Sequence, residues 1–366
     1  MKNTIGKKSF NYTTVILIAI ILFALAIRLP ALFTRHIEND EVIYQVLADK
    51  VSKDFSDYSL QGTAILNQLP AGIYDKPLFH HPPLFIYGVI LFKSLFGQRF
   101  IVLFPILCSV LTVLAIYLIG KKIYTEKVGL VAAFIFGFCP IAIHVSTKIW
   151  IDVLLTFLCT LTVYLAILAA DKDKLVWYIL GGISCGLAIL SKITALFILA
   201  PVFYLFIRKP LIVKRIDKMI FFSISALLVI VPWFFIFYKT FGIIFPWWVK
   251  PSEDLSQMFP FVRMILDRPF YFYFLNTIVV APIYIFAWLN IIRRIRKPSE
   301  WLEPIWALAF IVSLTIIGIK QGYIMRYILP AVPALAILSA VFLVEKNKKL
   351  LWIMATFFLG YGLTVA

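Results

Sequence analysis

The chain has 366 residues, of which 62% are hydrophobic and 14% are charged, and its mean hydropathy is +0.96. Soluble domains are roughly 45–50% apolar and about 25% charged, so this composition excludes an ordinary soluble fold and predicts a membrane protein. The formal net charge of +17 does not indicate nucleic-acid binding, because the basic residues gather in short clusters between apolar runs, without an interleaved stacking surface.

Apolar runs recur along the whole chain, and several reach the roughly 20 residues that a transmembrane helix needs. The first run follows Lys2, Lys7 and Lys8 but lacks a convincing cleavage site, so we expect an uncleaved helix. The four cysteines lie inside apolar runs without metal-type spacing and are expected to be small buried hydrophobes. The sequence predicts an all-α polytopic membrane protein, one domain over residues 1–366, with about eleven spans at 14–33, 100–119, 129–145, 150–170, 176–190, 193–207, 219–238, 270–291, 303–319, 328–344 and 350–366.

The apolar segment from Leu84 to Gly97 is shorter than a span and is predicted to be interfacial or re-entrant. If it does not cross, the basic loops near 121–127, 172–174, 208–218, 293–297 and 346–349 all lie on the amino-terminal side. If it crosses, they all face outward, against the positive-inside rule. We therefore expect a cytoplasmic amino terminus, an external carboxyl terminus, and two long external segments, 34–99 and 239–269, of which the first carries juxtamembrane helices. Long amphipathic loops usually have a function, so the chemistry is expected outside.

Three acidic residues stand at the predicted external ends of spans. Asp40 and Glu41 follow the first span and suit two roles, either the first turn of a helix capped by Asn39 or general-base catalysis toward an acceptor hydroxyl. Asp152 lies where the third span gives way to the fourth, and either caps that helix or is a functional intramembrane acid. The predicted topology places Asp152 on the same membrane face as Asp40.

Cations and aromatic residues accompany these acids in the predicted external segments. Pro82-Pro83 directs the preceding Lys76, His80 and His81 toward the water–lipid boundary, where they can hold a phosphate or a metal, although two adjacent histidines alone are a weak metal site. The other candidates are Lys192, Arg268, Arg326, Tyr323 and Tyr44. Their side chains either extend to the membrane surface by snorkelling, or bind a lipid phosphate and line the substrate cavity. No Walker-type loop, HExxH or dinucleotide fingerprint is present, so a nucleotide-driven machine is not expected.

The ordered set of motifs resembles the GT-C superfamily of glycosyltransferases, in particular the branch of the dolichyl-phosphate-mannose protein mannosyltransferases and the lipid A aminoarabinose transferase. The resemblance extends over about residues 28–340. Its features are, in order, Asp40-Glu41, Lys76-Pro77, His81-Pro82-Pro83-Leu84, Phe96-Gly97, Gly120-Lys121-Lys122, Gly129-Leu130, Lys148 through Asp152, Gly186-Leu187-Ala188 with Lys192, and Arg326-Tyr327 with Pro330 and Pro333.

The resemblance implies a GT-C-type bundle in a prokaryotic plasma membrane, with inverting transfer of a sugar from a polyprenyl-phosphate donor to a lipid, glycan or protein acceptor on the external face. Carried over, Asp40 is the general base or the carboxylate that orients the acceptor, Glu41 is a further catalytic candidate, and Asp152 is the second acid of the cavity. Lys76 or His81 binds the donor phosphate, assisted by Arg326, Lys192 and Arg268, while His80, Tyr44 and Tyr323 line the cavity.

The chain departs from the family pattern in several places. His81 stands where the family usually has lysine before Pro-Pro, and no soluble domain is expected after the last span. No Asp-x-Asp occurs, so no cofactor or metal is required by the sequence, and a divalent metal stays open. The rival interpretations are a multi-pass transporter or lipid flippase, which intramembrane Asp152 and Lys192 also suit, and a catalytically inactive scaffold subunit.

Overall fold

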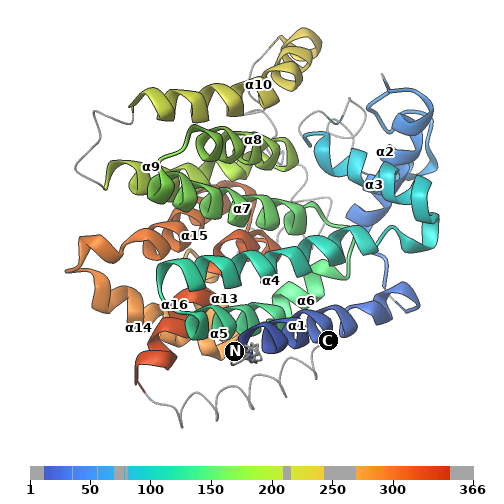
Figure 1. Cartoon of the computed structure of the whole chain (residues 1–366). Coiled ribbons are helices and arrows are strands. Elements are labelled where there is room, and N and C mark those ends of the chain that lie inside the picture. The colour runs from blue at the N-terminus through green and yellow to red at the C-terminus, as the bar shows by residue number, and fades with distance from the viewer. Residues whose placement is uncertain are drawn as a thin grey trace, which may run out of the picture.

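The computed structural model describes residues 12–34, 36–55, 57–69, 78, 81–208, 216–242 and 269–346. Three predicted site residues, Lys76, His80 and Arg268, fall outside these ranges, as do the predicted span 350–366 and most of the segment 239–269. All regular secondary structure within the described ranges is helical, in agreement with the all-α prediction. The helices lie side by side in one bundle, with α2 and α3 gathered at one end of it (Figure 1).

The α-helices are α1 (Tyr12–Ala26), α2 (Asn39–Lys53), α3 (Leu84–Phe96), α4 (Leu103–Ile123), α5 (Glu126–Gly137), α6 (Pro140–Ser146), α7 (Ile151–Lys172), α8 (Leu175–Ser191), α9 (Leu199–Ile207), α10 (Ile216–Phe241), α13 (Phe272–Val280), α14 (Ile285–Arg294), α15 (Leu302–Gln321) and α16 (Val332–Lys346). Short 3-10 helices join or extend them, namely η1 (Leu29–Leu32), η2 (Ala64–Gln68), η3 (Gln98–Phe100), η4 (Ile193–Ile198), η6 (Pro282–Tyr284), η7 (Pro298–Glu300) and η8 (Met325–Ala331).

The described part of the chain contains six straight helical segments that are long and apolar enough to span a membrane, or up to eight if each of two bent helix pairs counts as one span. Pro140 follows the 57° bend between α5 and α6, and Pro282 follows the 120° bend after α13. Proline lacks a backbone N–H and favours the first turn of a helix, so a new helix begins at the proline that follows each bend. The predicted spans 176–190 and 193–207 form shorter apolar helices, so the total of about eleven spans stays a prediction.

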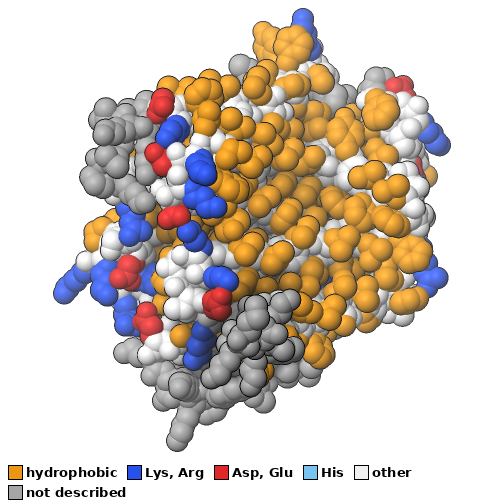
Figure 2. All heavy atoms as spheres, viewed as in Figure 1, with side chains coloured by type: hydrophobic (Ala, Val, Ile, Leu, Met, Phe, Trp, Pro, Cys, Tyr) orange, Lys and Arg blue, Asp and Glu red, His pale blue; other side chains and the backbone are white. Residues whose placement is uncertain are grey.

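One end of the bundle carries the basic loops, and we call it the basic end. Polar contacts tie helix termini together there: Thr13 with Glu126 (2.9 Å), Lys122 with Asp171 (2.7 Å), Lys218 with Asp173 (2.9 Å), Tyr204 with the Pro298 carbonyl (2.6 Å), Arg294 with Tyr124 (2.7 Å) and Arg293 with Glu345 (3.7 Å). Figure 2 shows Lys, Arg, Asp and Glu side chains along this margin and a broad apolar face beside it. The five loops that the sequence assigns to one side thus meet, as far as they are described, at one end of the bundle.

The opposite end carries α2 and is called the α2 end. Helix α3 stays at this end, because Lys93 near its end pairs with Asp49 of α2, and Gln98 just beyond it donates to Gln45 of α2 at 2.6 Å. The bent pair α13–α14 connects the two ends. The Tyr273 hydroxyl at its start donates to the Ile324 carbonyl at the α2 end, whereas Arg294 at its last residue lies in the network of the basic end.

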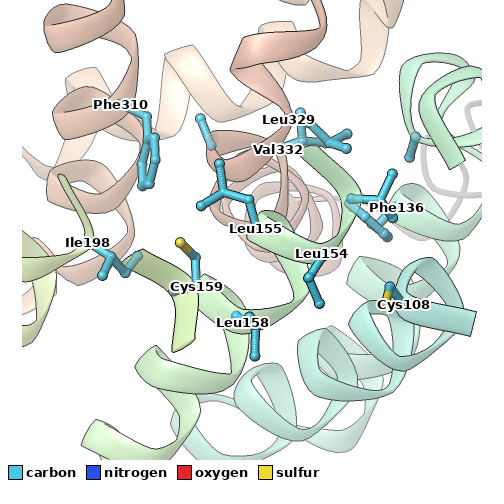
Figure 3. Close-up of a cluster of buried hydrophobic side chains, with 14 of the residues drawn as sticks. Cys108, Phe136, Leu154, Leu155, Leu158, Cys159, Ile198, Phe310, Leu329 and Val332 are labelled. Atoms are coloured by element: carbon cyan, nitrogen blue, oxygen red, sulfur yellow. The ribbon is translucent and has the colours of Figure 1, made fainter. Parts of the chain in front are cut away.

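Close helix packing gives the bundle its rigidity. Figure 3 shows the apolar core, in which Leu155 and Cys159 of α7 lie among residues of the surrounding helices, Phe310 and Ile198 among them. Helices α8 and α10 approach so closely that a Cβ on Gly182 would lie 2.1 Å from the Phe222 carbonyl oxygen. Such contacts between small residues are a main source of helix association in a membrane, where lipid tails are as apolar as the core.

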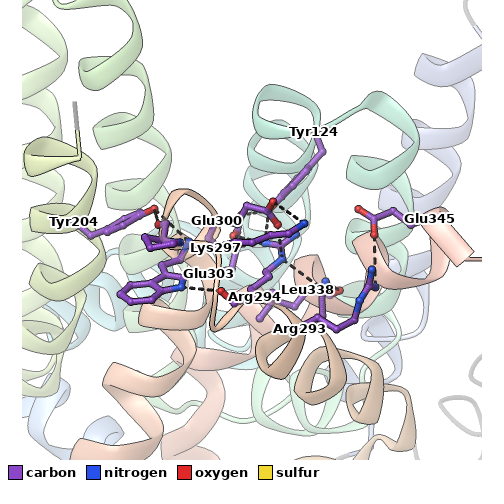
Figure 4. A network of polar contacts seen from close by, with 12 residues as sticks. Tyr124, Tyr204, Arg293, Arg294, Lys297, Glu300, Glu303, Leu338 and Glu345 are labelled. Atoms are coloured by element: carbon purple, nitrogen blue, oxygen red, sulfur yellow. Dashed lines mark hydrogen bonds and ion pairs between the residues drawn. The ribbon is translucent and has the colours of Figure 1, made fainter. Parts of the chain in front are cut away.

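A buried ionic network closes the basic end (Figure 4). Arg294, only 3% exposed, pairs with the 1% exposed Glu303 at 3.3 Å and donates to the Tyr124 hydroxyl, which in turn donates to Glu303 at 3.0 Å. Asn290 accepts from Arg294 at 3.2 Å and donates to the Leu338 carbonyl at 2.8 Å. The network therefore joins α4, α14, α15 and α16 at the end of the bundle away from α2.

Candidate functional site

The amino terminus of α2 places Asp40 at the α2 end of the bundle. Glu38, rather than the predicted Asn39, precedes the first turn, and its N–H donates to the Glu41 carboxylate at 3.1 Å. Two acids in the first turn are favourable beside the positive end of the helix dipole. Of these two, Asp40 keeps a side chain that is 36% exposed, whereas Glu41 is fully buried.

Glu41 joins α2 to the connector between α6 and α7. Its second carboxylate oxygen accepts the Ile149 N–H at 2.9 Å, so both of its oxygens hold backbone donors. Lys148 adds a second link to the same turn, because its ammonium donates to the His36 carbonyl and lies 3.4 Å from Glu38. The geometry thus gives Glu41 a bonding role that brings α2 against the start of α7, in place of the catalytic role predicted from the sequence.

Asp152 is 1% exposed and lies in the first turn of α7, whose N-cap position is occupied by Trp150. One carboxylate oxygen of Asp152 accepts from the ammonium of Lys192 at 2.7 Å, and the other lies 3.4 Å from Arg326 Nε. Lys192 is the residue that ends α8, and Arg326 lies in η8. An acid buried this deeply requires charge partners, and two elements supply them here, the end of α8 and η8.

Arg326 connects the two acids. Its Nη2 contacts Asp40 Oδ2, while its Nε faces Asp152, so α2, α7, α8 and η8 converge on one cluster of two acids and two cations. We call Asp40, Asp152, Lys192 and Arg326 the charge cluster. The sequence predicted these four residues as site residues, and the structure brings them together although 286 positions separate Asp40 from Arg326.

Aromatic rings surround the two cations. The guanidinium of Arg326 lies 4.3 Å from the centre of the Trp150 ring, and the ammonium of Lys192 lies 3.5 Å from the centre of the Tyr327 ring. Cation–π contacts of this kind hold a cation in a fixed position while it remains able to bind an anion. Trp150 and Tyr327 belong to motifs of the family resemblance, but the sequence predicts no role in the site for either of them, although each stands next to or near a predicted charged residue.

His81 and Tyr44 lie beside the charge cluster. Their rings meet edge to face with centroids 5.7 Å apart. Desolvation, together with the charges of Lys192 and Arg326, lowers the pKa of His81 to about 4. Burial, with a further contribution from Asp40, raises the pKa of Tyr44 well above its ordinary value. Both side chains are therefore neutral near pH 7, and His81 does not contribute a third positive charge to the cluster.

Tyr323 packs between α13 and α15. It is 2% exposed and packs against Phe272 and Tyr273 with ring centroids 5.7 and 5.6 Å away. Its ring also lies where a side chain on Gly318 would be, so its contacts are those of helix packing between α13 and α15. Among the described residues, no group of three or more His, Cys, Asp or Glu is placed to hold a metal ion.

Comparisons with known proteins agree with this fold. Residues 80–236 match the family model described as dolichyl-phosphate-mannose-protein mannosyltransferase. An uncharacterised protein of Aquifex aeolicus is 27% identical over 327 residues, which is 82% of this chain and 61% of that protein. A putative mannosyltransferase of Bacillus subtilis, YkcB, is 30% identical over 100 residues, which is 27% of this chain and 14% of that protein.

Solved structures share the fold. The crystal structure of ArnT from Cupriavidus metallidurans bound to undecaprenyl phosphate superposes with a TM-score of 0.68 at 16% identity, over 94% of this chain and 62% of ArnT. The oligosaccharyltransferase AglB from Archaeoglobus fulgidus, in complex with an inhibitory peptide and a dolichol-phosphate, gives a TM-score of 0.58 at 13% identity, over 97% of this chain and 56% of AglB. The chain spans about three fifths of the length of the Aquifex protein and of ArnT. It shares the fold of ArnT and AglB over most of its length, and the match of residues 80–236 to the mannosyltransferase family model agrees with the resemblance expected from the sequence.

Proposed function

We propose that the protein transfers a sugar from a polyprenyl-phosphate donor to an acceptor hydroxyl, with the charge cluster as its reaction centre. The observation that carries the proposal is the position of Asp40, a partly exposed carboxylate held beside two cations that a buried acid, Asp152, keeps in place. A general base and a binding site for a phosphate leaving group are the two elements that this reaction needs.

The reaction is a single displacement. The acceptor oxygen forms a bond to the anomeric carbon as the bond between that carbon and the phosphate oxygen breaks, which inverts the configuration of the sugar. The acceptor proton passes to Asp40, and the polyprenyl phosphate leaves with one more negative charge than it had as a diester. Arg326 and Lys192 lie where they can stabilise that developing charge in surroundings of low dielectric constant.

The other residues support this centre in different ways. Asp152 keeps Lys192 and Arg326 together, and Glu41 positions the turn that carries Asp40. His81 and Tyr44 supply uncharged polar surface at the edge of the cluster. Lys76 and Arg268 remain candidates for phosphate binding, and His80 and Tyr323 for the substrate cavity.

We assign the basic end to the cytoplasm and the α2 end to the external face. The assignment rests on the positive-inside rule, because the short loops rich in Lys and Arg meet at the basic end, together with the start of α1. It places the charge cluster at the external surface, where a lipid-linked sugar and an acceptor from outside the cell can both reach it. The donor enters from the bilayer, and the acceptor is a lipid, a glycan or a protein.

The test is to offer the purified full chain a panel of polyprenyl-phosphate sugars and to measure the lipid phosphate released and the sugar transferred. Asp40→Asn is expected to lose at least a hundredfold in turnover, the usual range for loss of a general base. Asp49→Asn is the matched control, since Asp49 lies on the same helix and pairs with Lys93 instead. Folded protein that releases no lipid phosphate from any donor overturns the proposal and favours the transporter interpretation, and equal turnover of both variants overturns the role of Asp40.

A further inference from the structure

Arg326 is shared between two acidic residues of the chain itself. Its Nη2 contacts Asp40 and its Nε lies 3.4 Å from Asp152, while Lys192 holds the other oxygen of Asp152 at 2.7 Å. The cluster therefore contains two negative and two positive charges, and each cation already has a carboxylate. A phosphate that enters this cluster does not meet an uncompensated positive charge.

The two acids differ in how readily they can yield a cation. Asp152 is 1% exposed, so separating it from its cations leaves a charge buried without compensation, which is strongly unfavourable. Asp40 is 36% exposed and can be solvated when its partner is taken away. The Arg326 guanidinium also lies 4.3 Å from the centre of the ring of Trp150, two residues before Asp152 in the chain, so we expect the contact with Asp40 to be the one that gives way.

We propose that Asp40 and the donor phosphate compete for Arg326, so that Asp40 is released as a base only when a lipid phosphate occupies the cluster. This inference rests on the proposed function and adds to it an order of events. A carboxylate in contact with a guanidinium accepts a proton poorly, because the positive charge stabilises its ionised form. Once the phosphate has taken Arg326, Asp40 is released from its ion pair and faces the acceptor.

The same competition explains how the product leaves. After the transfer Asp40 carries the acceptor proton and is neutral, so it does not compete with the lipid phosphate for Arg326. When Asp40 loses that proton to water it becomes an anion again, and it can return to Arg326 and weaken the hold on the lipid phosphate. The contact between Asp40 and Arg326 is in this view an autoinhibitory contact that the donor opens and that closes at the end of each cycle.

The experiment measures binding rather than turnover, with undecaprenyl phosphate as the probe in detergent micelles. Competition is reciprocal, so removing the charge of Asp40 must strengthen phosphate binding. Asp40→Asn is expected to bind the probe roughly ten- to a hundredfold more tightly than the wild type, the range that corresponds to one hydrogen bond with a charged group. The uncharged polyprenol of the same length is expected to bind both proteins equally, which separates the phosphate from the lipid chain.

A double-mutant cycle shows whether the effect passes through Arg326. In an Arg326→Gln background, Asp40→Asn is expected to give less than a threefold gain, since no guanidinium remains to be shared, whereas a general effect of charge would persist in full. Asp40→Ser repeats the measurement with a side chain of another shape, in case the asparagine variant folds poorly.

Equal or weaker binding by both Asp40 variants overturns the competition while the proposed function stands, provided that the wild type binds the probe. A wild type that neither binds undecaprenyl phosphate in preference to polyprenol nor releases lipid phosphate from any donor overturns the proposed function itself.

Discussion

Replacing Glu41 by glutamine preserves the shape of the side chain and removes its charge. In the native protein the buried carboxylate accepts two backbone hydrogen bonds, from Glu38 at 3.1 Å and from Ile149 at 2.9 Å. Glutamine has one acceptor oxygen and one amide nitrogen, so one of the two buried N–H groups faces another donor. The substitution therefore removes one charge-assisted hydrogen bond outright and weakens the other.

The magnitude follows from these contacts. A hydrogen bond to a charged group contributes about 1.5–3 kcal/mol, and a buried donor left without an acceptor costs a similar amount. Because the penalty for the unpaired N–H is part of the cost of losing its bond, we expect Glu41→Gln to lower the free energy of unfolding by about 2–4 kcal/mol. It also loosens the link between α2 and the start of α7, so transfer activity is expected to fall together with stability.

The assay uses the cysteines as reporters. Cys108, Cys139, Cys159 and Cys185 are all free and buried, so a thiol-reactive fluorescent dye reports unfolding on heating in detergent. The matched control is Glu126→Gln, since Glu126 also lies in the first turn of a helix but its ion pair with Lys121 is exposed. Exposed ion pairs contribute little, so this variant is expected to unfold close to the wild-type temperature. If Glu41→Gln unfolds at the same temperature as Glu126→Gln, the argument from buried hydrogen bonds is refuted.

Three further predictions concern other parts of the molecule. The pKa of His81 is lowered to about 4, below the ordinary value of about 6.5. The stability that neutral His81 contributes is thus complete above pH ~6.5 and is lost as the pH falls toward 4, and His81→Gln should flatten that part of the pH dependence of thermal unfolding. Gly182→Ala is expected to destabilise the protein by about 1–3 kcal/mol or more, as overpacking does, because the added methyl group meets backbone of α10. Gly137→Ala, where the neighbours lie at 3.4 Å or more, is the control, and equal unfolding temperatures would contradict the packing argument. Arg294→Met should cost about 3–5 kcal/mol by leaving Glu303 buried and unpaired, and adding Glu303→Met should recover most of that loss. A double variant that is less stable than Arg294→Met would show that the pair is not coupled in this way.

Some of the protein could be predicted from the order of its residues alone. The excess of apolar residues requires a lipid-facing helical fold, since backbone polar groups in a bilayer must be paired within each segment. The ordered motifs predicted a family resemblance, and the match of residues 80–236 to the family model and the fold shared with ArnT agree with it. Asp40 and Asp152 were selected because an ionisable residue beside an apolar run is costly unless it has a function or a partner.

Only the folded chain shows which of those residues share a site. The sequence treats Asp40 and Glu41 as equals, yet the direction of each side chain at the start of α2 leaves one partly exposed and buries the other against the N–H of Ile149. Tyr323 is also buried by tertiary packing, because its ring fills the space beside Gly318. A local pattern cannot predict this, because the burial of a side chain depends on neighbours that lie far away in the sequence.

The shape of the membrane crossings was decided in the same way. Hydropathy measures length and composition, and it cannot detect the 120° bend between α13 and the helix pair that begins at Pro282, which depends on how that segment packs between the two ends of the bundle. The partners of Arg326 are likewise a property of the tertiary structure, since α2, α7 and α8 supply its neighbours from three separate regions of the chain. Sequence therefore determined which charges the membrane would have to accommodate, and packing decided which of them compensate one another.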